Sequence, residues 1–282
     1  MNSKELRADI ESLYFKSLGF KNSDRIVWLD AVKSILGINL KAVSSDLLNM
    51  LVNEFNSNQF YPIENQDYDS MPDAISLYGL EKALLDRDLD SSIKNIYYLS
   101  RVSDGIQILE FLLEFSLKYS SKSYRYIWHI LRMQKFLNGK YMLESLNKSV
   151  LIILSEEYKT MPAKSIKSFL WLDFLSQDFE DIDELLLYYT IYNSELIREK
   201  SIKSLLLLRL ANIKSSDSNN LNIDGKQLDL DRKWISNYLY EIDGKMLNFN
   251  MIVFFNNIRS CLMLSNDELE KQYIWSYLNN RI

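Results

Sequence analysis

The chain has 282 residues, of which only 7 are glycine and 3 are proline. Sheets and βαβ units need these residues at hairpins and at strand–helix junctions, so their scarcity argues against both and favours helices joined by short polar turns. The formal net charge of −5 provides no positive field, which argues against nucleic acid and anionic lipid as partners.

Apolar residues at helical spacing predict three helices near the N-terminus. The first ends at Gly19, the second covers 24–36 and the third runs from about 44 to 55. The periodicity is lost over 56–71, which we interpret as a long loop. Pro72 suits the first turn of the next helix, which is predicted to reach about residue 86.

The remaining predicted helices are 91–101, 104–119, 122–137, 140–158, 163–177, 180–192, 194–213, 231–242, 245–263 and 266–280. The stretch 214–230 is polar and aperiodic, which indicates a flexible insertion. We therefore expect N-terminal helices at 1–57, a central array of helical hairpins at 72–213 and C-terminal helices at 231–282. One domain that contains all three segments is the alternative division.

Paired in order, the predicted helices form hairpins at intervals of about 30 to 50 residues, which is typical of helical repeats. The predicted fold class is therefore all-α, as an irregular array of stacked antiparallel hairpins that resembles an α-solenoid. A closed helical bundle is the alternative arrangement.

The N-terminal segment mixes charges through its predicted helix and lacks the apolar core of a signal peptide. The longest aliphatic runs, at 150–154 and 205–208, are much shorter than the roughly 18 apolar residues of a membrane span. Cys261 is the single cysteine and cannot form an intramolecular disulfide. We expect a cytoplasmic protein with no membrane span.

Metal and cofactor chemistry finds little support in the sequence. One histidine and one cysteine are too few for the common zinc and iron sites. Asp86, Asp88 and Asp90 alternate as in an EF-hand, but Ser91 and Tyr97 stand where that loop needs glycine and glutamate. No phosphate-binding glycine loop or nucleophile-elbow motif occurs. We expect neither a metal nor a cofactor, and we assign no catalytic residue.

A basic segment between Tyr119 and Tyr141 is unusual in this acidic chain, because it holds five basic residues and no acidic one. On a helix over 122–137, the cations share one side with aromatic rings. These side chains form the predicted binding site, here called the basic stripe: Lys122, Arg125, Trp128, His129, Arg132 and Lys135. Guanidinium groups would bind an anionic or acidic partner, and the rings would supply stacking surface.

Two alternatives would give the basic stripe a structural role. In one it is a solvated face, with Trp128 and Phe136 buried against a neighbouring hairpin. In the other, the acidic run at 178–184 neutralises it, although that run also suits the positive end of a helix dipole. The neighbouring tyrosines 97–98 and 188–189 are expected to expose at least one ring of each pair.

The leading functional prediction is a non-enzymatic helical protein-interaction module, such as an adaptor, a scaffold or an inhibitor of a protein partner. An acidic partner surface would suit the basic stripe, whereas overall acidity argues against nucleic acid. The sequence does not decide between a monomer and a homo-oligomer. The alternative is an all-α enzyme or small-molecule binder with a pocket between helices that uses Arg125, His129 and Arg132.

Overall fold

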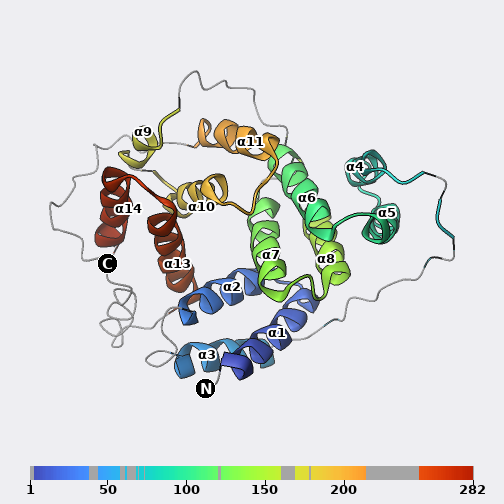
Figure 1. The fold of residues 1–282 in the computed structure, drawn as a ribbon, viewed down its shortest axis with the longest axis horizontal. Helices are drawn as coiled ribbons and strands as arrows, with labels where there is room; N and C mark the ends of the chain where they lie inside the picture. The colour runs from blue at the N-terminus through green and yellow to red at the C-terminus, as the bar shows by residue number, and fades with distance from the viewer. Residues whose placement is uncertain are drawn as a thin grey trace. The chain divides into compact units, whose positions relative to one another are not determined.

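The computed structural model describes residues 3–37, 44–57, 61, 68, 70–72, 74–119, 122–159, 169–177, 179–213 and 248–281. Thirteen helices account for 77% of these described residues, and no strand occurs among them, which confirms the all-α prediction (Figure 1). Apolar residues at helical spacing account for the helices that have a clear apolar face, such as Leu89–Val102 and Ser123–Leu137. The arrangement as stacked hairpins stays a prediction.

The chain divides into two compact units. The first comprises Met1–Asp30 and Asn49–Met161, and the second comprises Ala31–Leu48 and Pro162–Ile282. The three-part division expected from the sequence is not tested by this grouping and stays a prediction. In the part of the chain that the structure describes, no helix has both the length and the apolar composition needed to cross a lipid bilayer.

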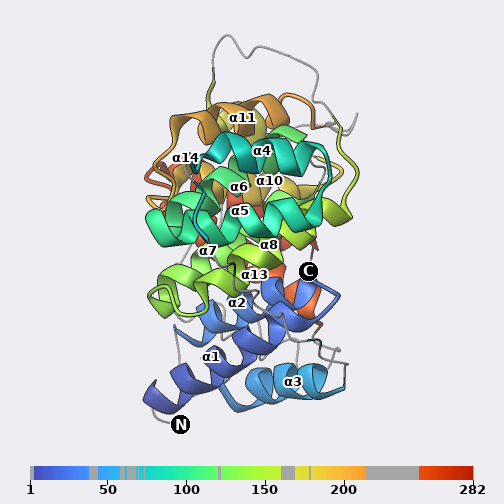
Figure 2. The same ribbon diagram turned by 90° about the vertical axis from the view of Figure 1, so that its right-hand side faces the viewer.

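The first unit contains the N-terminal helices and a layered group of five more. Its helices are α1 (Ser3–Gly19), the first part of α2 (Asp24–Leu36), most of α3 (Ser44–Asn56), α4 (Leu77–Leu85), α5 (Leu89–Val102), α6 (Gly105–Tyr119), α7 (Ser123–Leu137) and α8 (Met142–Ser155). Helix α8 packs against α5, α6 and α7, and α4 packs on α5 (Figures 1 and 2).

Helix α8 is the centre of this packing because one of its faces is continuously aliphatic. Leu146, Val150 and Ile153 recur at spacings of three and four residues and are completely buried. Helix α6 contributes Leu109 and Leu112 to the core, and both side chains are also completely buried. Burial of each such side chain stabilises the fold by about 1.5–3 kcal/mol.

A buried polar network holds α1 against α7 and α8. Tyr14 and Ser145 share a hydrogen bond of 2.8 Å between their hydroxyl oxygens, and the Gln134 side-chain N–H donates to the Ser145 hydroxyl at 2.6 Å. Burial raises the pKa of Tyr14 to about 12, so the phenol stays protonated and can donate. The network joins three helices and so places the C-terminal end of α1 beside α8.

Two starts of helices are set by side-chain caps. The helix predicted to begin at Pro72 begins at Leu77, because the Ser76 hydroxyl accepts from the Gly79 backbone N–H at 3.3 Å. Asp88, rejected above as a calcium ligand, caps α5 and accepts from the Ser91 backbone N–H at 3.0 Å. A local cap therefore outweighs the preference of proline for a first turn.

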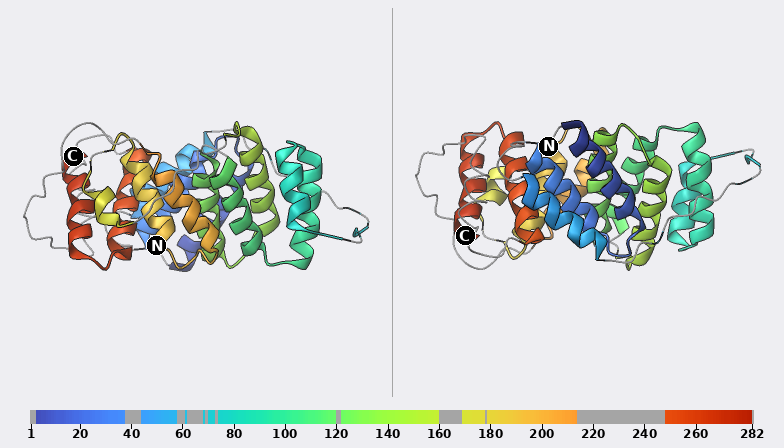
Figure 3. Two further views of the ribbon diagram at one scale, coloured as in Figure 1. Left: turned by 90° about the horizontal axis from the view of Figure 1, so that it is seen from above. Right: turned by 90° about the horizontal axis from the view of Figure 1, so that it is seen from below.

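The second unit contains the remaining parts of α2 and α3 and the C-terminal helices. These are α9 (Trp171–Leu175), α10 (Ile182–Asn193), α11 (Lys200–Leu210), α13 (Phe249–Leu264) and α14 (Glu268–Arg281). Helix α13 packs between α10 and α14, and Figure 3 shows α13 and α14 side by side, in red. Asp181, from the acidic run, caps α10 by accepting from the Glu184 backbone N–H at 3.0 Å.

Several predicted boundaries need correction. The helix predicted at 194–213 begins at Lys200, and the described part of the one predicted at 163–177 is helical over Trp171–Leu175. The insertion predicted at 214–230, the helix predicted at 231–242 and most of the loop predicted at 56–71 lie outside the described residues.

The tyrosine pairs are also different from the prediction. All four rings are buried: Tyr97, Tyr98, Tyr188 and Tyr189. Three of the four hydroxyls have polar partners inside the protein. Tyr97 accepts from Arg101 at 2.6 Å, and Tyr188 and Tyr189 donate to Glu184 and Glu270, each at 2.5 Å. The expectation that one ring of each pair faces solvent is therefore wrong, and at Tyr188 and Tyr189 the paired hydroxyls allow both rings to be buried.

The turn between α7 and α8 gives a test of local conformation. Gly139 has a φ of +81°, and a Cβ placed there would meet no atom within 4 Å. We expect Gly139→Ala to lower the free energy of unfolding by about 1 kcal/mol from backbone strain alone, measured by urea denaturation. Gly37→Ala, at a site without positive φ, is the control and should cause no loss. An equal loss in both variants would contradict the backbone explanation.

Candidate functional site

The structure places the six residues of the basic stripe on α7 and its N-cap, but in different environments. Lys122 and Lys135 are exposed, Arg125 and Arg132 are partly buried, and Trp128 and His129 are buried. Two of the six side chains are thus enclosed by protein. Trp128 is buried as the first structural alternative expects, whereas Phe136, which that alternative also buries, is only partly buried.

His129 and Arg132 converge on one buried carboxylate, Asp30 of α2. The His129 Nδ1 atom lies 2.7 Å from Asp30 Oδ2, and Arg132 Nε lies 3.1 Å from the same oxygen. Asp30 has no exposed side-chain surface. Burial lowers the pKa of His129, although the hydrogen bond to Asp30 acts in the opposite direction. A neutral imidazole that donates from Nδ1 leaves Arg132 to balance the charge of Asp30.

The acidic residue that pairs with the basic stripe was not considered in the sequence analysis, which named the run at 178–184. Asp30 and His129 are 99 positions apart, and α2 carries no local signal that identifies Asp30 as a buried residue. The contact is long-range, and periodicity alone does not reveal which helices pack together.

Three cations of α7 behave differently from this pair. Among the residues that the structure describes, the side chains of Lys122, Arg125 and Lys135 form no hydrogen bond or ion pair. Nearby cations outside the stripe are paired, since Lys118 lies 3.5 Å from Glu81. We call these three residues the α7 cation group. They are the part of the basic stripe that has no side-chain partner among the described residues.

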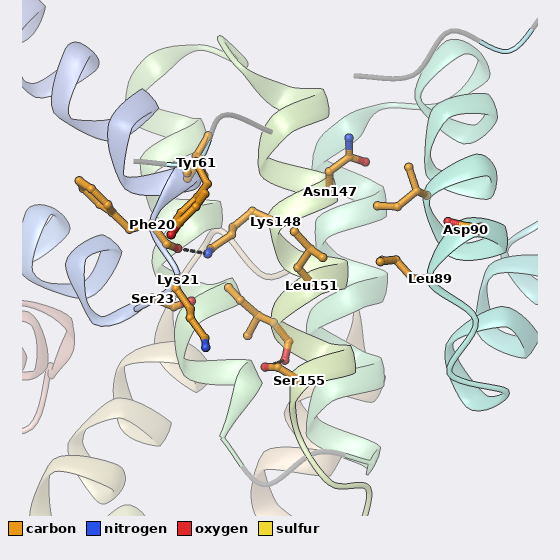
Figure 4. Close-up of a pocket in the computed structure, with 14 residues that line it drawn as sticks. Phe20, Lys21, Ser23, Tyr61, Leu89, Asp90, Asn147, Lys148, Leu151 and Ser155 are labelled. Carbon is orange, nitrogen blue, oxygen red and sulfur yellow. Dashed lines mark hydrogen bonds between the residues drawn. The ribbon is translucent and has the colours of Figure 1, made fainter. Parts of the chain in front are cut away.

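A pocket of about 580 Å³ lies in the first unit, beside α8 (Figure 4). Its walls come from the end of α1, the connection to α2, the start of α5 and one side of α8. The lining residues are Leu18, Gly19, Phe20, Lys21, Ser23, Tyr61, Leu89, Asp90, Ile93, Asn147, Lys148, Leu151, Ile152 and Ser155. None belongs to the basic stripe.

Lys148 is the unusual residue of this pocket. Its side chain is 5% exposed, and its Nζ donates a hydrogen bond of 2.6 Å to the Phe20 carbonyl oxygen (Figure 4). Burial lowers the pKa of Lys148 to about 8, so the amine still carries its proton at neutral pH in most molecules. Within the described residues, no carboxylate lies within ion-pair distance of Nζ.

A sequence signal for this site exists but was missed. Lys148, Leu151, Ile152 and Ser155 recur at the spacing of one helix face, so a lysine stands in line with aliphatic residues. The usual expectation for such a lysine is that its alkyl stem packs on the apolar surface and its ammonium group stays in water. The loop that covers it, at Phe20, is distant in sequence.

The described residues contain no cluster of three histidine, cysteine or acidic side chains that could hold a metal ion. Comparison of the chain with protein-family models, with curated proteins and with solved structures finds no match. The structure therefore defines an all-α protein with two candidate binding regions, the α7 cation group and the pocket at Lys148, and a functional proposal must rest on their chemistry.

Proposed function

We propose that this chain is a non-enzymatic helical protein-interaction module that binds an acidic segment of a protein partner through the α7 cation group. The observation that carries the proposal is Arg125. The residue is partly buried, and its guanidinium has no hydrogen bond or ion pair within the described residues, in a chain whose net charge is −5.

The chemistry of Arg125 favours a carboxylate ligand. A guanidinium has a planar array of donors that matches a carboxylate in a bidentate pair, and charge-assisted hydrogen bonds of this kind are stronger than neutral ones. Because Arg125 has already lost part of its hydration in the folded protein, a partner would face a smaller desolvation cost. The exposed ammonium groups of Lys122 and Lys135 would add long-range attraction for a negatively charged segment.

The alternative of an enzyme or small-molecule pocket built from Arg125, His129 and Arg132 has less support. His129 and Arg132 both contact Asp30, and the pocket of about 580 Å³ has none of the three residues in its lining. The His129 ring is almost completely buried, so a substrate has no access to it. The pair is better explained as a structural element.

Separate substitution of the two arginines tests the proposal. Arg125→Ala is expected to change the free energy of unfolding by less than about 0.5 kcal/mol, because the side chain has no described partner. It should weaken binding of a fluorescent peptide of alternating glutamate and aspartate by about tenfold or more, measured by anisotropy. Arg132→Ala should instead lower stability by about 1–3 kcal/mol, because it removes the charged partner of buried Asp30.

The control is Lys82→Ala, which removes an exposed cation from α4 and should leave peptide affinity unchanged. Wild-type affinity should fall steeply when salt is added, as expected for exposed charges. Equal binding by wild type and Arg125→Ala, or no binding by wild type at low salt, would refute the role of the α7 cation group.

A further inference from the structure

The pocket at Lys148 has features of a ligand site that are independent of the α7 cation group. An ammonium has three hydrogens to donate, and Lys148 uses one of them on the Phe20 carbonyl oxygen. No other hydrogen bond or ion pair of this amine occurs within the described residues. A buried cation without a counter-ion is costly to the fold, and a bound anion would remove that cost.

The charges around the pocket leave Lys148 accessible to an anion. The lining contains two lysines, Lys21 and Lys148, and one acidic residue, Asp90. Figure 4 shows Asp90 on α5, across the pocket from Lys148, whose amine points to Phe20. The side of the pocket formed by α8 and the α1–α2 connection is therefore positive.

The rest of the wall is suited to an alkyl chain. Aliphatic side chains come from three elements, and they are Leu18, Leu89, Ile93, Leu151 and Ile152. Leu89 and Leu151 are partly exposed to solvent although both are large and apolar. A chain that covers them would gain hydrophobic free energy in proportion to the area removed from water. The pocket volume is within the range that small ligands occupy.

We infer that this pocket binds a small single-chain amphiphile with a carboxylate head, the head paired with Lys148 Nζ and the chain packed along Leu151 and Ile152. A monoanionic carboxylate matches the two free hydrogens of one ammonium. A phosphate group carries about −1.5 to −2 charge at pH 7, which exceeds the single positive charge of the Lys148 ammonium. The α7 cation group takes no part in this site.

Isothermal titration calorimetry with sodium octanoate tests the inference, with 1-octanol as the uncharged probe. Wild-type protein should bind octanoate at one site, and Lys148→Met should weaken that binding by about tenfold or more because the charged partner is lost. Binding of 1-octanol should be the same in both proteins. Lys82→Met, which removes an exposed cation from α4, should bind octanoate as wild type does.

A second variant locates the chain in this pocket. Leu151→Glu changes a partly exposed residue and places a negative charge on the wall, so it should reduce binding of both probes. If Lys148→Met fails to fold, Leu151→Glu still tests whether octanoate binds in this pocket. Octanoate binding that is unchanged in Leu151→Glu or in folded Lys148→Met would overturn the inference, as would the absence of saturable binding to wild type up to about 10 mM.

Discussion

Replacement of Asp30 by alanine is expected to lower the free energy of unfolding by about 3–5 kcal/mol. Asp30 is completely buried, and its Oδ2 atom is the shared partner of Arg132 at 3.1 Å and His129 at 2.7 Å. Removal of the carboxylate takes away the ion pair at 3.1 Å from a largely buried guanidinium and the acceptor from a buried imidazole N–H. Each lost contact adds to the desolvation cost of the group that made it.

Urea denaturation of matched variants measures this effect. The control is Asp24→Ala on the same helix, where the carboxylate accepts one hydrogen bond of 3.0 Å from the Tyr126 hydroxyl at a partly exposed site. We expect that variant to lose about 1 kcal/mol. Asp30→Asn, which keeps the shape but not the charge, should fall between wild type and Asp30→Ala. A loss no larger than that of Asp24→Ala would show that Arg132 and His129 do not depend on Asp30.

Lys148 is expected to make stability depend on pH in the alkaline range. The pKa of Lys148 is about 8 in the folded protein, against an ordinary value of 10.5 that applies when the chain is unfolded. Between these two values the unfolded chain holds a proton that the folded protein has released, so stability contributed at this site rises with pH. The rise should total about 3 kcal/mol, since each pKa unit corresponds to about 1.4 kcal/mol.

The difference in unfolding free energy between wild type and Lys148→Met isolates this contribution, because other titrating groups are common to both proteins. Measured by urea denaturation from pH 7.5 to pH 10.5, the difference should change in favour of wild type. The exposed Lys82 is solvated in both states, so the corresponding difference for Lys82→Met should stay flat. A flat difference for Lys148→Met would mean that water solvates its amine, and would remove the premise of the amphiphile site.

The sequence by itself determined the fold class and most of the helices. Scarcity of glycine and proline and apolar residues at helical spacing predicted α2, α3, α6 and α7 within one or two residues of their observed bounds, and the end of α1 at Gly19. These features are local, since backbone hydrogen bonds and caps within a helix depend on residues a few positions apart. The start of α4 was missed because two local signals competed, and the cap at Ser76 prevailed over Pro72.

Tertiary structure alone decided which side chains meet. The pairing of Asp30 with Arg132 and the bond between Lys148 and the Phe20 carbonyl oxygen join residues more than 100 positions apart. Local periodicity places such residues on a helix face but does not say which helix covers it. Burial, and with it the charge state and the available hydrogen bonds of Arg132 and Lys148, depends on that packing. The basic stripe was therefore visible in the sequence, whereas its division into a structural pair and the α7 cation group, which has no partner among the described residues, was not.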